Sequence, residues 1–99
     1  MIETRVIRYK TKIESADENL RLIEAVFAEL AEKELAGIRY QVYRLDDGVS
    51  FVHIATLDSE KNPLQGSPAF GAFQSTLGSR LEEGPHPVVA TVVGSHGVN

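Results

Sequence analysis

The segment IRYQVYRLDDGVSFVHIATL (residues 38–57) decides the fold, because it predicts two strands joined by a turn, with large side chains on both faces. The turn is expected at Asp46-Asp47-Gly48, between two runs rich in β-branched and aromatic residues. Two helices expected elsewhere in the chain can cover only one face of the resulting sheet. The other face, expected to carry Tyr43, Phe51 and Leu57, would be a larger apolar patch than a soluble monomer usually exposes. We therefore expect a second copy of the chain to cover it.

The register of this hairpin determines which side chains share a face, since a slip of one residue exchanges the two faces. A two-residue loop at Asp47-Gly48 would place on one face Tyr40, Val42, Phe51 and His53. We predict instead a three-residue loop with Gly48 in the left-handed bulge position, because this register leaves one face cleanly apolar. The apolar face then holds Ile38, Tyr40, Val42, Val52 and Ile54, and the mixed face holds Arg39, Gln41, Tyr43, Phe51, His53 and Ala55.

A strand and a long helix precede the hairpin. The strand is expected from Glu3 to about Thr11 and the helix from Ser15 to about Leu35. Ser15 and Glu18 have the spacing of a capping box. The apolar stripe of the helix recurs every three or four residues and consists of Leu20, Ile23, Val26, Phe27, Leu30 and Ala31.

A polar connection, a second helix and a last strand follow the hairpin. Residues 58–66 could form a lid over a pocket or a plain crossover. Ser67 is expected to cap the second helix, with Pro68 as its first residue. Gly71 and Gly78 weaken that helix, and either let it approach the sheet closely or are merely tolerated. Its buried side is expected to hold Phe70, Phe73, Leu77 and Leu81, with Gly84-Pro85-His86-Pro87 ending it and residues 88–93 forming the last strand.

This order of elements predicts an α+β fold. Strand–helix–strand–strand–helix–strand, with antiparallel pairing and right-handed crossovers, gives the ferredoxin-like sheet of strand order 4-1-3-2 with two helices on one face. Residues 1–99 are expected to form a single domain. About four large side chains per protomer, buried between two such sheets, would contribute roughly 6–12 kcal/mol before the costs of association.

Composition excludes several classes of function. A net charge of -4 argues against nucleic acid, because binding to phosphates needs clustered Lys and Arg. The chain has no cysteine, which excludes disulfides and thiolate sites. No apolar run is long enough to span a membrane, and the N-terminus lacks the apolar stretch of a signal peptide. A cytoplasmic protein without membrane or nucleic-acid partners is expected.

The chain resembles the dimeric α+β barrel proteins, the superfamily of the antibiotic biosynthesis monooxygenases and of small uncharacterised bacterial relatives. The resemblance lies in length, element order and the placement of Phe51-Val52-His53-Ile54-Ala55, of residues 67–73 (SPAFGAF) and of Gly94-Ser95. It implies a homodimer around a ligand cavity and oxidation of a small phenolic or aromatic substrate without metal or flavin. The chain departs from those monooxygenases in having no Trp and no Asn on the first strand.

His53 is the candidate catalytic residue, because it is a titratable group near neutrality placed in the middle of a strand. As a base it would need an enclosed pocket beside it, of about 300–1,000 Å³, with Tyr43 and Gln41 orienting the substrate. Phe51 is a candidate ligand contact and Arg8 could attract a carboxylate. The alternative is that His53 and the two aromatic residues belong to a dimer interface, and that Arg8 lies at the surface.

Metal and serine chemistry find no support in the motifs. His53, His86 and His96 have no metal-ligand spacing, and no Gly-x-Ser-x-Gly elbow occurs. Two hypotheses remain open. The first is a cofactor-independent monooxygenase, and the second is a non-catalytic dimer that binds a small ligand or serves assembly.

Overall fold

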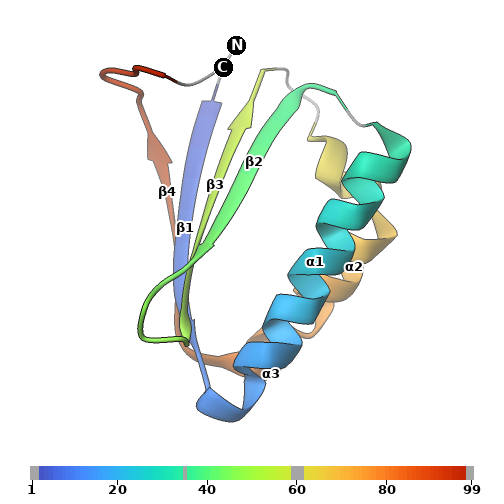
Figure 1. The fold of residues 1–99 in the computed structure, drawn as a ribbon, viewed down its shortest axis with the longest axis vertical. Coiled ribbons are helices and arrows are strands. Elements are labelled where there is room, and N and C mark those ends of the chain that lie inside the picture. Colours follow the sequence, from blue (N-terminus) through green and yellow to red (C-terminus); the bar gives the residue numbers. More distant parts are fainter. Residues whose placement is uncertain (1–2, 35, 59–61, 98–99) are drawn as a thin grey trace.

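A computed structural model describes residues 3–34, 36–58 and 62–97. The predicted order of strands and helices is confirmed (Figure 1). The elements are β1 (Glu3–Thr11), the 3-10 turn η1 (Ile13–Ser15), α1 (Ala16–Lys33), β2 (Ile38–Arg44), β3 (Ser50–Leu57), the 3-10 turn η2 (Pro63–Gly66), α2 (Pro68–Ser75), the short α3 (Leu77–Arg80) and β4 (Leu81–Ala90).

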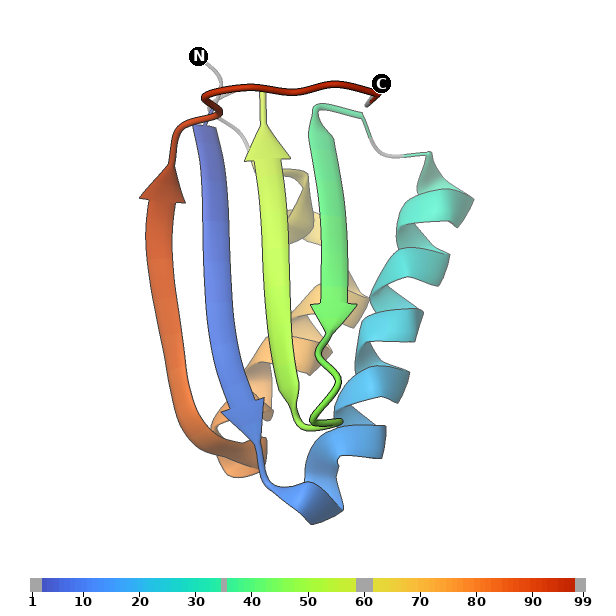
Figure 2. The same ribbon diagram turned by 60° about the vertical axis from the view of Figure 1, so that its left-hand side comes forward.

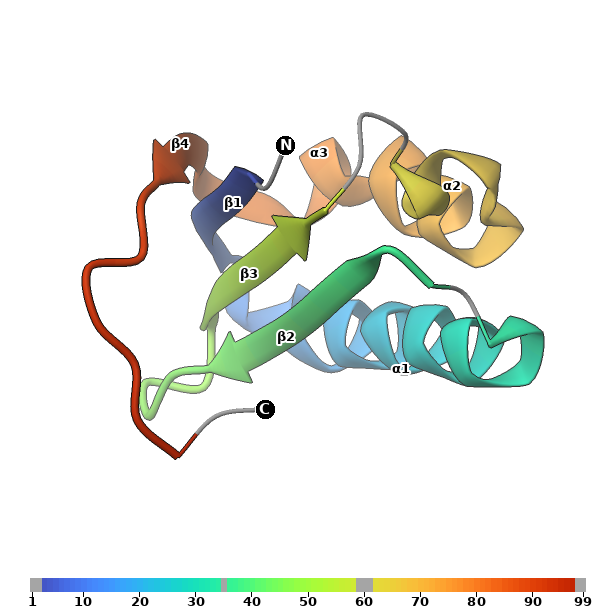
Figure 3. The ribbon, with the colours of Figure 1, turned by 90° about the horizontal axis from the view of Figure 1, so that it is seen from above.

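The strands form one four-stranded antiparallel sheet of order β2-β3-β1-β4, which confirms the predicted topology. Seen from above, α1 and α2 lie on the same side of this sheet (Figure 3). Figure 2 looks onto the other side, which none of the described helices covers. We call these two sides the covered face and the open face. No helix in the described ranges is long and apolar enough to cross a membrane.

Helix α1 packs on the sheet through the stripe that the periodicity predicts. Ile23 and Val26 are buried, while Phe27 and Leu30 pack against the core. Asn19 is also buried on this stripe, with none of its surface exposed. The predicted capping box is not formed, since the Ser15 side chain makes no capping bond. Helix α1 ends at Lys33, and the end expected near Leu35 lies outside the described residues.

The predicted hairpin register is wrong. Val42 lies opposite His53 and Arg44 opposite Phe51, which is the register of the two-residue alternative. Leu45 N donates to Ser50 O at 2.8 Å, so residues 46–49 form a four-residue loop. A loop of four residues places the same side chains on each face as a loop of two residues.

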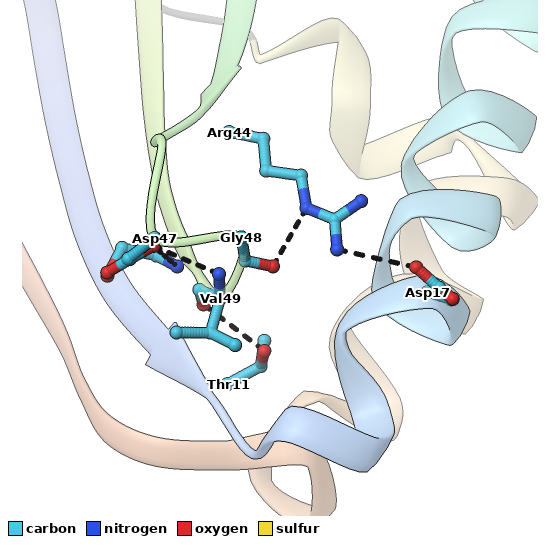
Figure 4. Close-up of polar contacts among 7 residues, drawn as sticks. Thr11, Asp17, Arg44, Asp47, Gly48 and Val49 are labelled. Carbon is cyan, nitrogen blue, oxygen red and sulfur yellow. Dashed lines mark hydrogen bonds and ion pairs between the residues drawn. The ribbon is translucent and has the colours of Figure 1, made fainter.

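Local contacts hold this longer loop together. Asp47 accepts hydrogen bonds from the backbone N–H groups of Val49 and Ser50. Arg44 reaches from the strand end to the Gly48 carbonyl and to Asp17 of α1 (Figure 4). Thr11 of β1 donates to the Val49 carbonyl at 3.2 Å (Figure 4). The carboxylate of Asp47 thus organises a wider turn than the glycine position alone indicates.

The corrected register exchanges the two faces of the hairpin. Phe51, His53 and Leu57 lie on the covered face, with 1%, 4% and 4% of their surfaces exposed. Of Tyr43, Phe51 and Leu57, which we expected on the open face, only Tyr43 lies there, and 48% of its surface is exposed. The open face therefore mixes apolar and polar side chains, namely Thr4, Val6, Arg8, Gln41, Tyr43, Val52, Ile54, Thr56 and Val88.

The C-terminal part also differs from the prediction. Ser67 caps α2 as expected, accepting from Phe70 N at 3.0 Å, with Pro68 at the first position. The last strand, however, is residues 81–90, so the Gly84–Pro87 segment lies inside β4 rather than ending a helix. Prolines are tolerated there because β4 is an edge strand, in which about half of the backbone N–H groups have no neighbouring strand to bind. Residues 91–97 form no strand.

Candidate functional site

A chain of polar side chains, four of them buried and one half-buried, crosses the core beneath the covered face. Tyr40 Oη lies 2.6 Å from His53 Nδ1, and Tyr9 Oη lies 2.7 Å from His53 Nε2. Asn19 Nδ2 donates to Tyr9 Oη at 2.9 Å, and Arg80 Nε donates to Asn19 Oδ1 at 2.9 Å. We call these five residues the polar chain.

The sheet register and the helices bring the polar chain together. His53 of β3 pairs with Ile7 of β1 and Val42 of β2, so Tyr9 and Tyr40 are its diagonal neighbours on the same face. Asn19 enters from α1 and Arg80 from the end of α3. The sequence separation of Asn19 and Arg80, 61 residues, shows that the chain is a product of the tertiary fold.

Burial determines the protonation states along the chain. Burial lowers the pKa of His53 from 6.5 to about 4, so the imidazole is neutral at pH 7. Burial also raises the pKa of Tyr9 to about 12, although the hydrogen bond from Asn19 and the charge of Arg80 oppose the shift. Burial raises the pKa of Tyr40 as well. Both phenols are therefore protonated at neutral pH.

Arg80 is an unusual core residue, a guanidinium with 1% of its surface exposed. Besides Asn19, it donates to Thr76 Oγ1 and to the Phe73 carbonyl, and its guanidinium carbon lies 5.2 Å from the centre of the Phe73 ring. Within the described ranges no carboxylate lies within 4.0 Å of it. Its charge is held by oriented dipoles, and burial lowers its pKa.

A groove of about 470 Å³ lies between α1 and β2, and Tyr40 lines it. His53 is not among the residues that line this groove. Tyr40 instead connects the two, because one side chain both lines the groove and contacts the imidazole. The lining residues are Leu20, Ile23, Glu24, Phe27, Tyr40, Gln41, Val42, Tyr43, Arg44 and Phe51.

The five residues predicted as a site from the sequence lie in two places. His53 and Phe51 are buried on the covered face. Gln41 and Tyr43 lie on the open face of β2, where Tyr43 Oη donates to Gln41 Oε1 at 3.0 Å. Both residues also line the groove. Arg8 lies opposite Val52 on the open face and is exposed.

Sequence reasoning missed four members of the polar chain, namely Tyr9, Asn19, Tyr40 and Arg80. Two of them left a signal. Asn19 stands four residues before Ile23 on the buried stripe of α1, and the rejected two-residue register places Tyr40 on the same face as His53. Arg80 left none, because a charged residue at the end of a helix is ordinarily solvated.

Metal binding has no candidate site in the part of the chain that the structure describes, where no three His, Asp or Glu side chains converge. Buried side-chain nitrogen and oxygen atoms in that part all have a hydrogen-bond partner. Of the connection predicted as a lid or crossover, residues 59–61 lie outside the described residues, while Pro63–Gly66 forms η2.

Comparisons by sequence and by structure give different results. No protein-family model and no curated protein sequence matches the chain. Solved structures match it over nearly their whole length. Rv0793 from Mycobacterium tuberculosis is 17% identical with a TM-score of 0.75, covering 96% of this chain and 98% of its own. A candidate antibiotic biosynthesis monooxygenase from Bacteroides thetaiotaomicron is 12% identical with a TM-score of 0.81, covering 99% and 94%.

A third structure has a described activity of its own. SnoaB from Streptomyces nogalater, a cofactor-independent oxygenase, is 18% identical with a TM-score of 0.69, covering 98% of each chain. Identities this low establish likeness of fold and no more. The chain therefore has the predicted ferredoxin-like α+β fold, and it shares this fold with solved structures that include one described as a candidate antibiotic biosynthesis monooxygenase.

Proposed function

We propose that the chain binds a small aromatic or phenolic compound in the groove between α1 and β2 and oxidises it with molecular oxygen, without a metal or organic cofactor. The observation that carries this proposal is Tyr40, which lines the groove while its hydroxyl lies 2.6 Å from the buried His53. A hydroxyl bound to a neutral imidazole at the wall of an apolar groove suits an oxygen-bearing aromatic ligand.

The groove supports an aromatic ligand by size and by lining. Its volume of about 470 Å³ is within the usual range for small-molecule sites, about 300–1,000 Å³. Phe27 stacks on Tyr40 with ring centres 5.0 Å apart, which gives the groove a flat aromatic wall. Leu20, Ile23 and Val42 complete the apolar lining.

Oxidation without a cofactor requires a substrate that itself supplies the electrons. An anthrone-type phenol can do this: its methylene carbon loses two hydrogens, one atom of O₂ becomes the new carbonyl oxygen, and the other leaves as water. The fold likeness to SnoaB supports this class of reaction for the chain. His53 acts in this proposal through Tyr40 rather than by direct contact with the substrate.

The open face supports the proposed homodimer. Val88 is 57% exposed and Tyr43 48% exposed there, and Val6, Val52 and Ile54 lie between them on neighbouring strands. A two-fold pairing of this face with itself would remove these side chains from water. Light scattering should then give about twice the 10.9 kDa mass of one chain.

A second candidate is a non-catalytic dimer that binds a small aromatic ligand in the same groove. The absence of Trp and the burial of His53 away from the groove favour it. It predicts ligand binding without oxygen consumption.

An oxygen electrode with 1,8-dihydroxyanthrone distinguishes the two candidates. The test variant is Glu24→Trp, because Glu24 is exposed and lines the groove, so that an indole there fills the groove without disturbing the core. Glu32→Trp on the exposed side of the same helix is the matched control. We expect enzyme-dependent oxygen uptake in the wild type and in Glu32→Trp, and a loss of at least tenfold in Glu24→Trp.

Binding of the anthrone without uptake in any of these proteins supports the second candidate. Equal uptake by both tryptophan variants contradicts the assignment of the groove as the site.

A further inference from the structure

The hydrogen bonds of the polar chain run in one direction, and Arg80 sets that direction. A guanidinium carries donors only, so the Asn19 amide must present its oxygen to Arg80 Nε. The amide nitrogen of Asn19 then faces Tyr9 Oη, which accepts at 2.9 Å. The orientation of the Asn19 amide, which distances alone leave ambiguous, follows from the chemistry of its neighbour.

The next link is the choice of tautomer at His53. A neutral imidazole has one donor and one acceptor nitrogen, and each contacts a tyrosine hydroxyl. If Nε2 carried the proton, Tyr9 Oη would accept from both Asn19 and His53. The proton of Tyr9 would then have no acceptor among the described residues, in a side chain only 2% exposed. A buried donor without a partner disfavours that tautomer on the order of ten- to a hundredfold.

The other tautomer moves the unpaired proton from the buried Tyr9 to Tyr40, which is half-buried and lines the groove. Tyr9 donates to Nε2, and Nδ1–H donates to Tyr40 Oη at 2.6 Å. Tyr40 Oη is thereby used as an acceptor, and its own proton remains to be donated. Within the described ranges His53 is the only hydrogen-bond partner of that hydroxyl, and Tyr40 lines the groove.

We infer that Tyr40 donates a hydrogen bond into the groove, and that the ligand presents a carbonyl or phenolate oxygen to it. The chain that ends in Tyr40 begins at a buried cation, so each bond polarises the next in the same sense. His53 is on this inference a positioning residue that holds Tyr40 as a donor. It is not a base for protons from the groove, because the nitrogen that meets Tyr40 already carries a proton.

This inference rests on the proposed function only in placing a ligand in the groove. The direction of the chain is testable with no ligand at all. In wild-type protein labelled with ¹⁵N-histidine, NMR should show His53 neutral between pH 6 and 8, with Nδ1 protonated and Nε2 unprotonated. A proton on Nε2, or on both nitrogens, would overturn the inference and leave the proposed function standing.

The ligand part is tested with two probes of similar size. 2-Acetylnaphthalene carries a carbonyl acceptor and 2-isopropylnaphthalene carries none. Since the probes differ in apolar area, the informative quantity is the ratio of their dissociation constants in each protein. The Tyr40→Phe variant should change this ratio about three- to tenfold against the ketone, measured by fluorescence titration.

Thr56→Val is the control, because it deletes a hydroxyl on the open face, where Thr56 contacts Thr4 at 3.1 Å. It should keep the wild-type ratio. An unchanged ratio in Tyr40→Phe overturns the donor role of Tyr40. Failure of both probes to bind the wild type overturns the ligand assignment together with the proposed function, while the tautomer measurement still decides the direction of the chain.

Discussion

The two faces of the sheet are built from the same strands, yet they differ in which side chains are buried and which are exposed. On the covered face polar groups are buried and fully paired, as Tyr9, His53 and Arg80 show with 2%, 4% and 1% exposure. On the open face apolar groups are exposed, as Val88 shows at 57%. The comparison teaches that this core accepts buried polar groups when each has a hydrogen-bond partner, whereas the face without a helix leaves apolar groups such as Val88 in water.

The covered face tolerates its polar chain because every member has a partner. A buried hydrogen-bond network stabilises one arrangement of the core only when it is complete, and each gap in it is costly. Removing a member should therefore cost much more there than a similar change on the open face. Four predictions test this difference, taken from the largest expected effect to the smallest.

Asn19→Ala should lower the free energy of unfolding by about 4 kcal/mol. The variant removes the acceptor of Arg80 Nε and the donor to Tyr9 in one step, and leaves a buried cation poorly solvated. Urea denaturation measures the loss. Thr56→Val, which breaks a hydrogen bond on the open face, should cost less than about 1 kcal/mol. Equal losses in the two variants would remove the distinction between the faces.

Acid should destabilise the protein through His53. The unfolded chain takes up a proton near pH 6.5, while the folded chain does so only near pH 4, so the stability is complete above pH 6.5 and lost as pH falls toward 4. The loss should reach about 3 kcal/mol over that window. Glu29 and Asp47, whose pKa values hydrogen bonds lower to about 2, act only at lower pH, below their ordinary values near 4.

Urea denaturation at pH 7, 5.5 and 4.5 checks this window. His53→Gln should flatten the pH dependence, whereas His86→Gln on the exposed edge strand should keep the wild-type slope. A wild-type slope in His53→Gln would show that another group titrates between pH 4 and 6.5.

Gly84→Ala should destabilise the fold by about 1–3 kcal/mol, since Gly84 has a φ of +96° that other residues adopt only under strain. A Cβ there would also lie 3.0 Å from Arg8 O and from the Cβ of Tyr9, the middle member of the polar chain. Gly78→Ala in α3 is the matched control, because a Cβ there meets nothing within 4 Å. The control should be neutral or slightly stabilising, and thermal melting of both variants decides the point.

Val88→Asp on the open face should change the stability of one protomer by less than about 0.5 kcal/mol. It should nevertheless reduce the mass in solution to that of a single chain, because a carboxylate would enter the proposed sheet–sheet interface. Light scattering measures the mass, with Val93→Asp, a fully exposed site beyond β4, as control. An unchanged mass in Val88→Asp would move the interface away from this face.

The structure also answers whether Gly71 of α2 and Gly78 of α3 let the helices approach the sheet closely or are merely tolerated. A Cβ at Gly71 or Gly78 would have open space around it, so neither glycine serves close approach to the sheet. Both are tolerated rather than required. A glycine that the fold does require, Gly84, lies in the segment that the sequence pattern assigns to the end of a helix.

The residues themselves determined the order of elements, the bounds of β1, the capped start of α2 and the strand order, because these depend on periodicity and turn chemistry within a few residues. The tertiary structure alone decided the hairpin register and the polar chain. Both registers satisfy the turn at Gly48 locally, and the choice follows from placing Phe51 and His53 against Tyr9 and the helices. Asn19 and Arg80 meet across 61 residues, a contact that no local pattern encodes because its free energy exists only once the core has closed around both.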